Sequence, residues 1–144
     1  MHKLALNQLH KSFSGKPVLR GVSLSIPIGK TIVLLGSSGS GKSTLLRCIN
    51  QLEIPDSGTL QVDEEILAFP LAHENKTHYS AAVRNIRKKV GMVFQQFHLW
   101  PHLTVLQNLT EAPIHVLKQA PQSVNAAAIE ILTTLGIAEK AKHY

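Results

Sequence analysis

The chain has 144 residues, 44% of them hydrophobic, and its 15 Lys and Arg residues exceed its nine Asp and Glu residues, which gives a net charge of +6. This length fits one domain or part of a larger one. Segment 1–7 soon breaks its apolar character and no apolar run approaches the about 18 residues that cross a bilayer, so we expect a soluble chain without a signal peptide.

Two strands are predicted at the start of the chain, over residues 3–11 and 18–26, with a turn between them at 14–17. A third apolar run, 31–35, has apolar side chains at consecutive positions. Such a run is typical of a parallel strand that is covered on both faces.

A complete phosphate-binding loop, or Walker A motif, follows this run. Residues 36–44 match the pattern G-x-x-x-x-G-K-[ST] and lead into a helix-like stretch at 45–50. Its glycines permit a tight bend whose N–H groups converge on an anion at the helix start. We expect Lys42 to reach the β- and γ-phosphates of a nucleoside triphosphate and Ser43 to ligate Mg²⁺. The expected nucleotide-binding residues of the loop are Gly36, Ser37, Ser38, Gly39, Ser40, Gly41, Lys42, Ser43 and Thr44.

The helix after the loop contains the only cysteine, Cys48. We interpret Cys48 as a small core residue in a protein of a reducing compartment. One side of this helix is expected to carry Leu45, Leu46, Ile49 and Leu52. A breaker at 54–58 precedes a short strand at 59–62, and residues 63–80 are expected to form an irregular, exposed excursion.

The second half begins with a short helix expected at 80–88 and a buried strand at 90–94. The basic run 84–89 has no aromatic residue for base stacking, so we interpret it as a solvated helix end. Thr104 and Gln107 form a capping box that opens a helix, which Pro113 is expected to disturb. A final helix is expected to be capped by Ser123, to stop at Gly136 and to carry on one face Val124, Ala128, Ile131, Leu132 and Leu135.

Taken together, these segments resemble the ATP-binding subunit of ABC transporters over essentially the whole chain. Segment 90–95 resembles the strand that enters the Q-loop, and segment 99–105 resembles the stretch after it. The sequence of segments 95–102 and 111–114 is most similar to that of the ATP-binding subunits of polar amino acid importers. Methionine, phosphate and lipoprotein systems share parts of this sequence.

The resemblance implies an α/β fold: the N-terminal half of a P-loop NTPase (RecA-like) core with an antiparallel β subdomain and the start of a helical subdomain. Residues 1–94 would form the ATP-binding core with its antiparallel β region. Residues 95–144 would form the Q-loop and the beginning of the helical subdomain.

Residue roles also follow from the resemblance. Phe13 takes the place of the aromatic residue that stacks on adenine; the alternative is simple packing in the small sheet. Gln95 is the Q-loop glutamine, expected to touch Mg²⁺ or the attacking water, so Lys42 and Gln95 are the catalytic candidates and Ser43 and Gln95 the metal candidates. Part of the surface that receives the permease would be formed by Phe97, Leu99, Trp100 and Pro101, for which local packing is the alternative.

The implied protein is an ATPase, a translocase that uses ATP and Mg²⁺ to drive uptake of a polar amino acid. Its expected place is the cytoplasmic face of the cell membrane, as a peripheral subunit. The expected partners are a transmembrane permease, a second ATP-binding subunit in a head-to-tail dimer and, indirectly, a periplasmic or surface solute-binding protein. No nucleic acid is expected.

The chain ends at Tyr144, before the place of the family's signature motif, Mg²⁺-binding Asp, catalytic Glu and switch His. We therefore expect a piece of a longer protein that binds nucleotide weakly, does not hydrolyse it, and is marginally stable or oligomeric alone. The alternatives are a non-hydrolysing nucleotide-binding module, a P-loop kinase or small GTPase, and a nucleic-acid protein on the ABC fold. A GTPase would need Asn-Lys-x-Asp, but Thr77-His78 follows Asn75-Lys76.

Overall fold

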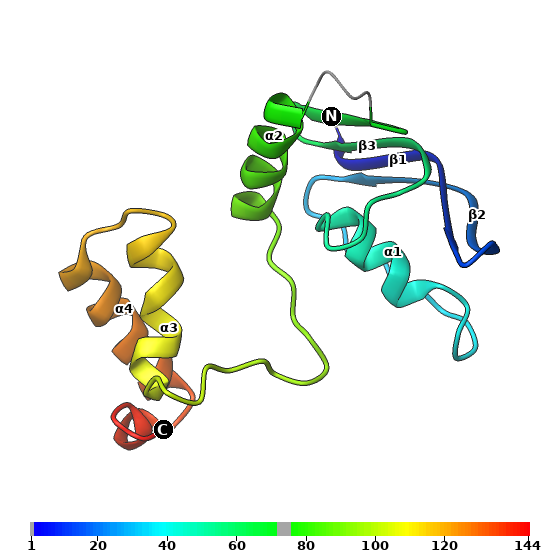
Figure 1. Ribbon diagram of the computed structural model, residues 1–144. Helices are drawn as coiled ribbons and strands as arrows, with labels where there is room; N and C mark the ends of the chain where they lie inside the picture. The colour runs from blue at the N-terminus through cyan, green and yellow to red at the C-terminus, as the bar shows by residue number, and fades with distance from the viewer. Residues whose placement is uncertain (1, 72–75) are drawn as a thin grey trace. The chain divides into compact units, whose positions relative to one another are not determined.

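The computed structural model describes residues 2–71 and 76–144, which form two compact units, Met1–Met92 and Val93–Tyr144 (Figure 1). The functional division that we expect, between residues 94 and 95, stays a prediction. None of the described helices has the length and apolar character needed to cross a membrane.

The first unit is built on a four-stranded antiparallel sheet in the order β2-β1-β3-β4. Its strands are β1 (His2–Phe13), β2 (Lys16–Pro27), β3 (Ser57–Val62) and β4 (Glu65–Phe69). The two strands expected at the start of the chain and the short strand after the breaker are therefore confirmed. β1 pairs with both β2 and β3, so it connects the first hairpin to the rest of the sheet.

Two helices complete the first unit: α1 (Lys42–Ile49) and α2 (Lys76–Lys89). They share one hydrophobic core with the sheet. Its buried members are Leu4, Leu6, Leu9, Leu19, Leu45, Cys48, Leu60, Val62, Leu67, Phe69, Ala82, Val83 and Ile86. On α1, Leu45 and Cys48 are buried. Leu46 and, just beyond the helix, Leu52, which we expected on the same side as Leu45, are 48% and 45% exposed.

The irregular excursion expected at 63–80 is wrong. β4 pairs with β3 through a tight turn at Asp63, and α2 already covers Lys76–Lys89. Leu67 and Phe69 point into the core, while Ile66 is 58% exposed. An apolar residue on the exposed face hid the alternation that marks a strand. Residues 72–75 of the expected excursion lie outside the described residues.

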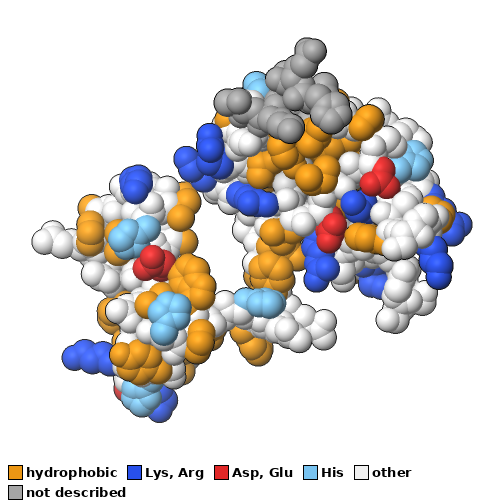
Figure 2. Space-filling view, viewed as in Figure 1, with side chains coloured by type: hydrophobic (Ala, Val, Ile, Leu, Met, Phe, Trp, Pro, Cys, Tyr) orange, Lys and Arg blue, Asp and Glu red, His pale blue; other side chains and the backbone are white. Residues whose placement is uncertain are grey.

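The strands expected at 31–35 and 90–94 are also absent from the structure. Val33 is 72% exposed and Val93 96% exposed, and Figure 2 shows hydrophobic side chains at the surface of both units. A strand is held by hydrogen bonds to a neighbouring strand, and none of the described strands pairs with either run. Both runs therefore leave apolar side chains in contact with solvent.

The second unit contains α3 (Val105–His115), α4 (Pro121–Thr134) and a 3-10 turn at Ala138–Lys140. The capping box is confirmed, because the Gln107 backbone N–H donates to Thr104 Oγ1 at 3.3 Å and the Thr104 N–H donates to Gln107 Oε1 at 2.8 Å. Pro113 lies inside α3, which continues to His115.

The expected cap of α4 is wrong. Ala120 is the N-cap residue and Pro121 occupies the first turn, where its missing N–H costs nothing. Ser123 lies inside the helix and its hydroxyl donates to the Ala120 carbonyl at 2.8 Å. α4 buries Val124, Ala128 and Leu132, whereas the two other residues expected on this face, Ile131 and Leu135, are exposed.

Ion pairs hold α2 against the β3–β4 turn. Lys89 Nζ lies 3.2 Å from both Asp63 Oδ2 and Glu64 Oε2, and Lys3 Nζ lies 3.6 Å from Asp63 Oδ1. The hydrogen bond from Lys89, and then the charge of Lys3, keep the pKa of Asp63 below its ordinary value of 3.8. Since the folded state favours the ionised carboxylate, this contribution to stability is present above that ordinary value and is lost as the pH falls through the folded pKa.

Replacing Asp63 by Asn should therefore lower the free energy of unfolding at neutral pH, and the difference from the wild type should shrink to nothing as the pH falls through the lowered pKa of Asp63 in the folded state. Asn is the suitable replacement because Asp63 has a φ of 51°, which Asn tolerates. Urea unfolding followed by circular dichroism from pH 7 down to pH 2.5 measures this difference. A difference that does not change with pH would contradict the ionic explanation.

At Gly58, near the start of β3, the chain comes very close to the backbone of β1. Its φ is 104°, and a Cβ atom there would clash with the Gln8 carbonyl oxygen and lie 2.7 Å from that of Asn7. Gln8 is part of an irregularity in the β1 pairing. Backbone atoms cannot move aside as a flexible side chain does, so this position requires glycine.

Gly58→Ala should lower the free energy of unfolding by about 3 kcal/mol or more, because backbone strain and overpacking add. Gly29→Ala is the matched control, since Gly29 has a φ of 74° but no atom within 4 Å of the added Cβ. That variant should lose only about 1 kcal/mol. Equal losses in urea unfolding would show that the close approach to β1 does not matter.

Candidate functional site

The glycine-rich loop lies against the start of β2 and leads directly into α1. Gly41 is the N-cap of α1, with a φ of 92°. A Cβ atom at Gly41 would lie 3.2 Å from the Val18 carbonyl oxygen and equally close to the side chains of Val18 and Leu19. The left-handed backbone and the contact with β2 together explain why the loop needs glycine at this position.

The ammonium group of Lys42 closes this loop from within. It donates hydrogen bonds to the carbonyl oxygens of Gly36, at 2.9 Å, and Ser37, at 2.7 Å, and lies 3.2 Å from Ser40 Oγ. The loop therefore bends around one positive charge. A second turn contact, from the Ser40 N–H to the Ser37 carbonyl at 3.3 Å, tightens the same bend.

The start of α1 offers backbone donors beside this charge. The first helical hydrogen bond runs from the Leu45 N–H to the Gly41 carbonyl at 2.8 Å. The N–H groups of Lys42, Ser43 and Thr44 precede it and have no partner within the helix. No acidic residue lies in the first turn, so the positive end of the helix dipole and the lysine act together on an anion.

Phe13 shares a pocket with the loop. This pocket, of about 230 Å³, is lined by Phe13, Val18, Gly39, Ser40, Gly41, Lys42, Ser43 and Thr44. The Phe13 ring lies at the end of β1 and is 42% exposed. A half-exposed ring beside a phosphate-binding loop offers a face for stacking, and its role in binding adenine stays a prediction.

A larger cavity, of about 450 Å³, lies in the same unit, but its lining is mostly apolar. Apart from Lys42 and Ser43, its lining consists of Leu24, Ile26, Ile32, Val33, Leu34, Leu45, Leu46 and Ile49. Such a lining does not solvate a polyphosphate. We therefore place the candidate site by its donors and charge rather than by size.

The Q-loop candidate Gln95 lies in the second unit, so its position relative to the phosphate-binding loop stays a prediction. Phe97 is 85% exposed and Leu99 68% exposed. Asn108 on α3 fixes the backbone at Trp100, because its Oδ1 accepts from the Trp100 N–H at 2.9 Å and its Nδ2 donates to the Trp100 carbonyl at 3.1 Å. An apolar pocket of about 230 Å³ lies there, between segment 99–103 and the start of α3.

The site has no ready-made metal cage. Among residues 2–71 and 76–144, no group of three or more His, Cys, Asp or Glu residues is placed to hold a metal ion. Mg²⁺ commonly binds through substrate phosphates, water and one or two protein oxygens. The Ser43 hydroxyl at the mouth of the loop fits that mode and stays the predicted ligand.

Comparison with known proteins decides the family. The family model described as "ABC transporter" matches residues 19–144. The chain belongs to the ABC transporter family. It is 46% identical to the octopine permease ATP-binding protein P of Rhizobium meliloti, covering 94% of this chain and 52% of that protein. It is 44% identical to the histidine transport ATP-binding protein HisP of Pseudomonas aeruginosa, covering 97% of this chain and 56% of that protein.

The fold is confirmed by a solved ABC structure, cbiO1 from Clostridium perfringens. The TM-score is 0.71 at 23% identity, and the match covers 99% of this chain and 53% of the other. The α/β fold with the N-terminal half of a P-loop NTPase is thus confirmed. The chain spans about half the length of the curated relatives that it matches.

Several contacts around the site were not foreseen from the ABC motifs. Arg87 on α2 donates to the carbonyls of Asn50, at 3.3 Å, and Gln51, at 2.8 Å, and so satisfies the end of α1. Lys11 on β1 donates to the Ile54 carbonyl at 2.8 Å. Period-2 spacing predicts that Lys11 and Phe13 share one face of β1, but the sequence gives no signal for partners so far along the chain.

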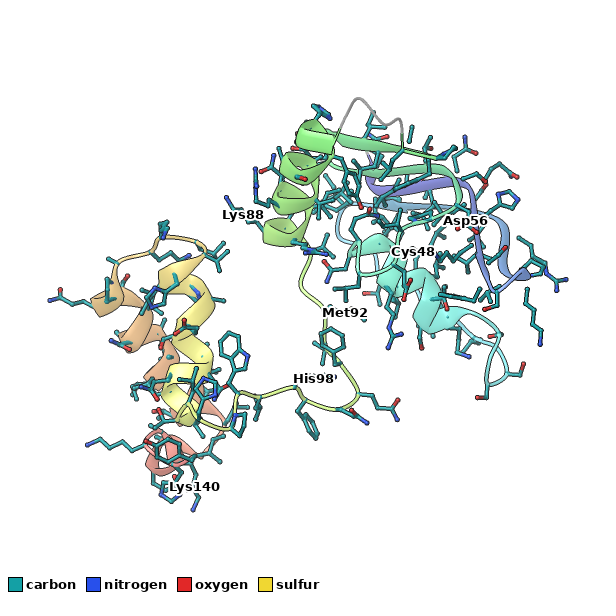
Figure 3. The ribbon with its side chains drawn as sticks, in the orientation of Figure 1. Cys48, Asp56, Lys88, Met92, His98 and Lys140 are labelled. Atoms are coloured by element: carbon teal, nitrogen blue, oxygen red, sulfur yellow. The ribbon has the colours of Figure 1, made fainter. Side chains whose placement is uncertain are left out.

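Cys48 lies on α1, in the core that this helix shares with the sheet (Figure 3), and is fully buried, as expected of a small core residue. Burial is the main cause that raises the pKa of its thiol, to about 11. The thiolate, which is the reactive form, should therefore be depleted about a hundredfold in the folded chain.

Iodoacetamide at pH 8 should label Cys48 slowly in buffer and rapidly in urea. Rapid labelling of the folded chain would contradict the packing of α1 on the sheet.

Proposed function

We propose that this chain binds the triphosphate of ATP and forms part of the ATPase subunit of an ABC importer. The observation that carries the proposal is the Lys42 ammonium enclosed by the glycine-rich loop, beside the half-exposed ring of Phe13. Both groups lie in one pocket of a chain that belongs to the ABC family. An anion at the mouth of this loop would meet one positive charge and a set of N–H donors without a competing carboxylate.

Each group has one physical task in this proposal. The N–H groups of 36–44 bind phosphate oxygens, and the Lys42 ammonium turns from two carbonyl oxygens to the terminal phosphates. Phe13 stacks on the base, and the Ser43 hydroxyl offers an oxygen to Mg²⁺. Mg²⁺, when bound, neutralises charge on the phosphates. Gln95 would orient water near the same end of the nucleotide and report its state to the permease.

The transported solute that we propose is a polar amino acid. The names of the similar proteins support this class, since they describe transport of histidine and arginine and permeases for octopine and nopaline. The proposed partners are a membrane permease, a second ATP-binding subunit and, indirectly, a solute-binding protein, which places this subunit at the cytoplasmic face of the membrane. The exposed side chains of Phe97, Leu99 and Trp100 are the proposed contact with the permease.

Lys42→Ala should weaken ATP binding about ten- to a hundredfold, because a hydrogen-bonded charge is removed from the loop. Lys30→Ala is the matched control: it removes one exposed lysine just before the apolar run 31–35 and should leave the affinity unchanged. Titration calorimetry with ATP and Mg²⁺ measures both variants. Equal affinities of the wild type and Lys42→Ala would place the nucleotide elsewhere.

A further inference from the structure

We propose that Lys11 is a positioning residue that holds the Phe13 ring at the mouth of the nucleotide pocket. This inference rests on the proposed function, because it assigns Lys11 a part in binding the base of ATP. Lys11 is not among the residues that line the pocket. It would act on the nucleotide only through the ring.

The ammonium group of Lys11 has a fixed place. Its side chain is only 14% exposed, and Nζ donates to the Ile54 carbonyl at 2.8 Å. Two carboxylates of the turn after α1 complete its surroundings, Asp56 Oδ1 at 3.6 Å and Glu53 Oε2 at 4.0 Å. A lysine held by three oxygens has little freedom to move, in contrast to most surface lysines.

The same ammonium group lies 5.1 Å from the centroid of the Phe13 ring. This distance is within the range of about 6 Å over which a cation attracts the face of an aromatic ring. Phe13 ends β1 and is 42% exposed. Since Phe13 is not part of the buried core, the contact with Lys11 is one of the restraints on the position of its ring.

The contact between Lys11 and the Phe13 ring is connected through α1 to the phosphate-binding loop. α1 begins at Lys42, and the turn after its other end carries Asp56, which lies against β1 (Figure 3). There Asp56 Oδ2 accepts from the Ser12 N–H at 2.6 Å, and the Asp56 N–H donates to the His10 carbonyl at 2.9 Å. α1 therefore connects two parts of the site. The N–H groups that would bind phosphate lie at its start, and the turn after its end holds Lys11, which contacts the Phe13 ring.

Loss of the Lys11 charge should consequently weaken recognition of the base and leave recognition of the phosphates intact. Lys11→Met keeps most of the apolar stem and removes the ammonium group. We expect it to weaken ATP binding about three- to tenfold and to leave the affinity for inorganic triphosphate unchanged. Lys11→Arg, which retains a cation able to contact the ring, should restore ATP binding.

The experiment measures binding of ATP and of inorganic triphosphate, each with Mg²⁺, to the 144-residue chain. Lys3→Met is the matched control, because it removes an ion-paired lysine from the other end of β1 and should change neither affinity. Lys11→Met is also made in a Phe13→Ala background. If Lys11 acts through the ring, the second substitution adds nothing there.

Three results would overturn the proposal: unchanged ATP affinity in Lys11→Met, equal weakening of ATP and triphosphate, or an undiminished effect in the Phe13→Ala background. The last two would assign Lys11 a general role in the stability of the first unit. If the proposed nucleotide site is itself wrong, the result is different: Lys42→Ala then leaves the affinities for ATP and for triphosphate unchanged.

Discussion

The bend of backbone around the Lys42 ammonium is the constraint on which the rest of the site depends. A chain of backbone N–H groups can bind an anion only if those groups converge and stay free of other partners. In this structure Gly41 makes the bend against β2, and Lys42 holds the loop carbonyls together on its inner side. The donors at the start of α1 are thereby left available.

The sheet and α1 place the remaining parts around this bend. β1 carries Phe13 at its end and Lys11 two residues before, while β2 supports the loop through Val18 and Leu19. After the turn that follows α1, the chain lies close to β1 at Gly58 of β3, where only glycine fits. The antiparallel sheet is thus more than a support, since its first strand contributes an aromatic wall to the pocket.

Local patterns were enough to predict the loop, its helix, the first hairpin and the capping box at Thr104, because each depends on residues close in sequence. Some errors arose where a distant partner decides the structure, and others where a local pattern was misleading, as at Ser123, which lies inside α4 and does not cap it. The apolar run 31–35 has the composition of a buried strand, yet none of the described strands pairs with it. β4 was missed because Ile66 is apolar but exposed. The role proposed for Lys11 depends on Glu53, Ile54 and Asp56, more than 40 positions along the chain.

The most direct test of the account is an amide NMR spectrum of the chain recorded with increasing ATP and Mg²⁺. Backbone N–H groups that bind phosphate oxygens change their chemical shifts strongly. The largest changes should fall on the amides of residues 36–44, together with the ring protons of Phe13. Changes centred on the basic end of α2, with the loop unaffected, would contradict it.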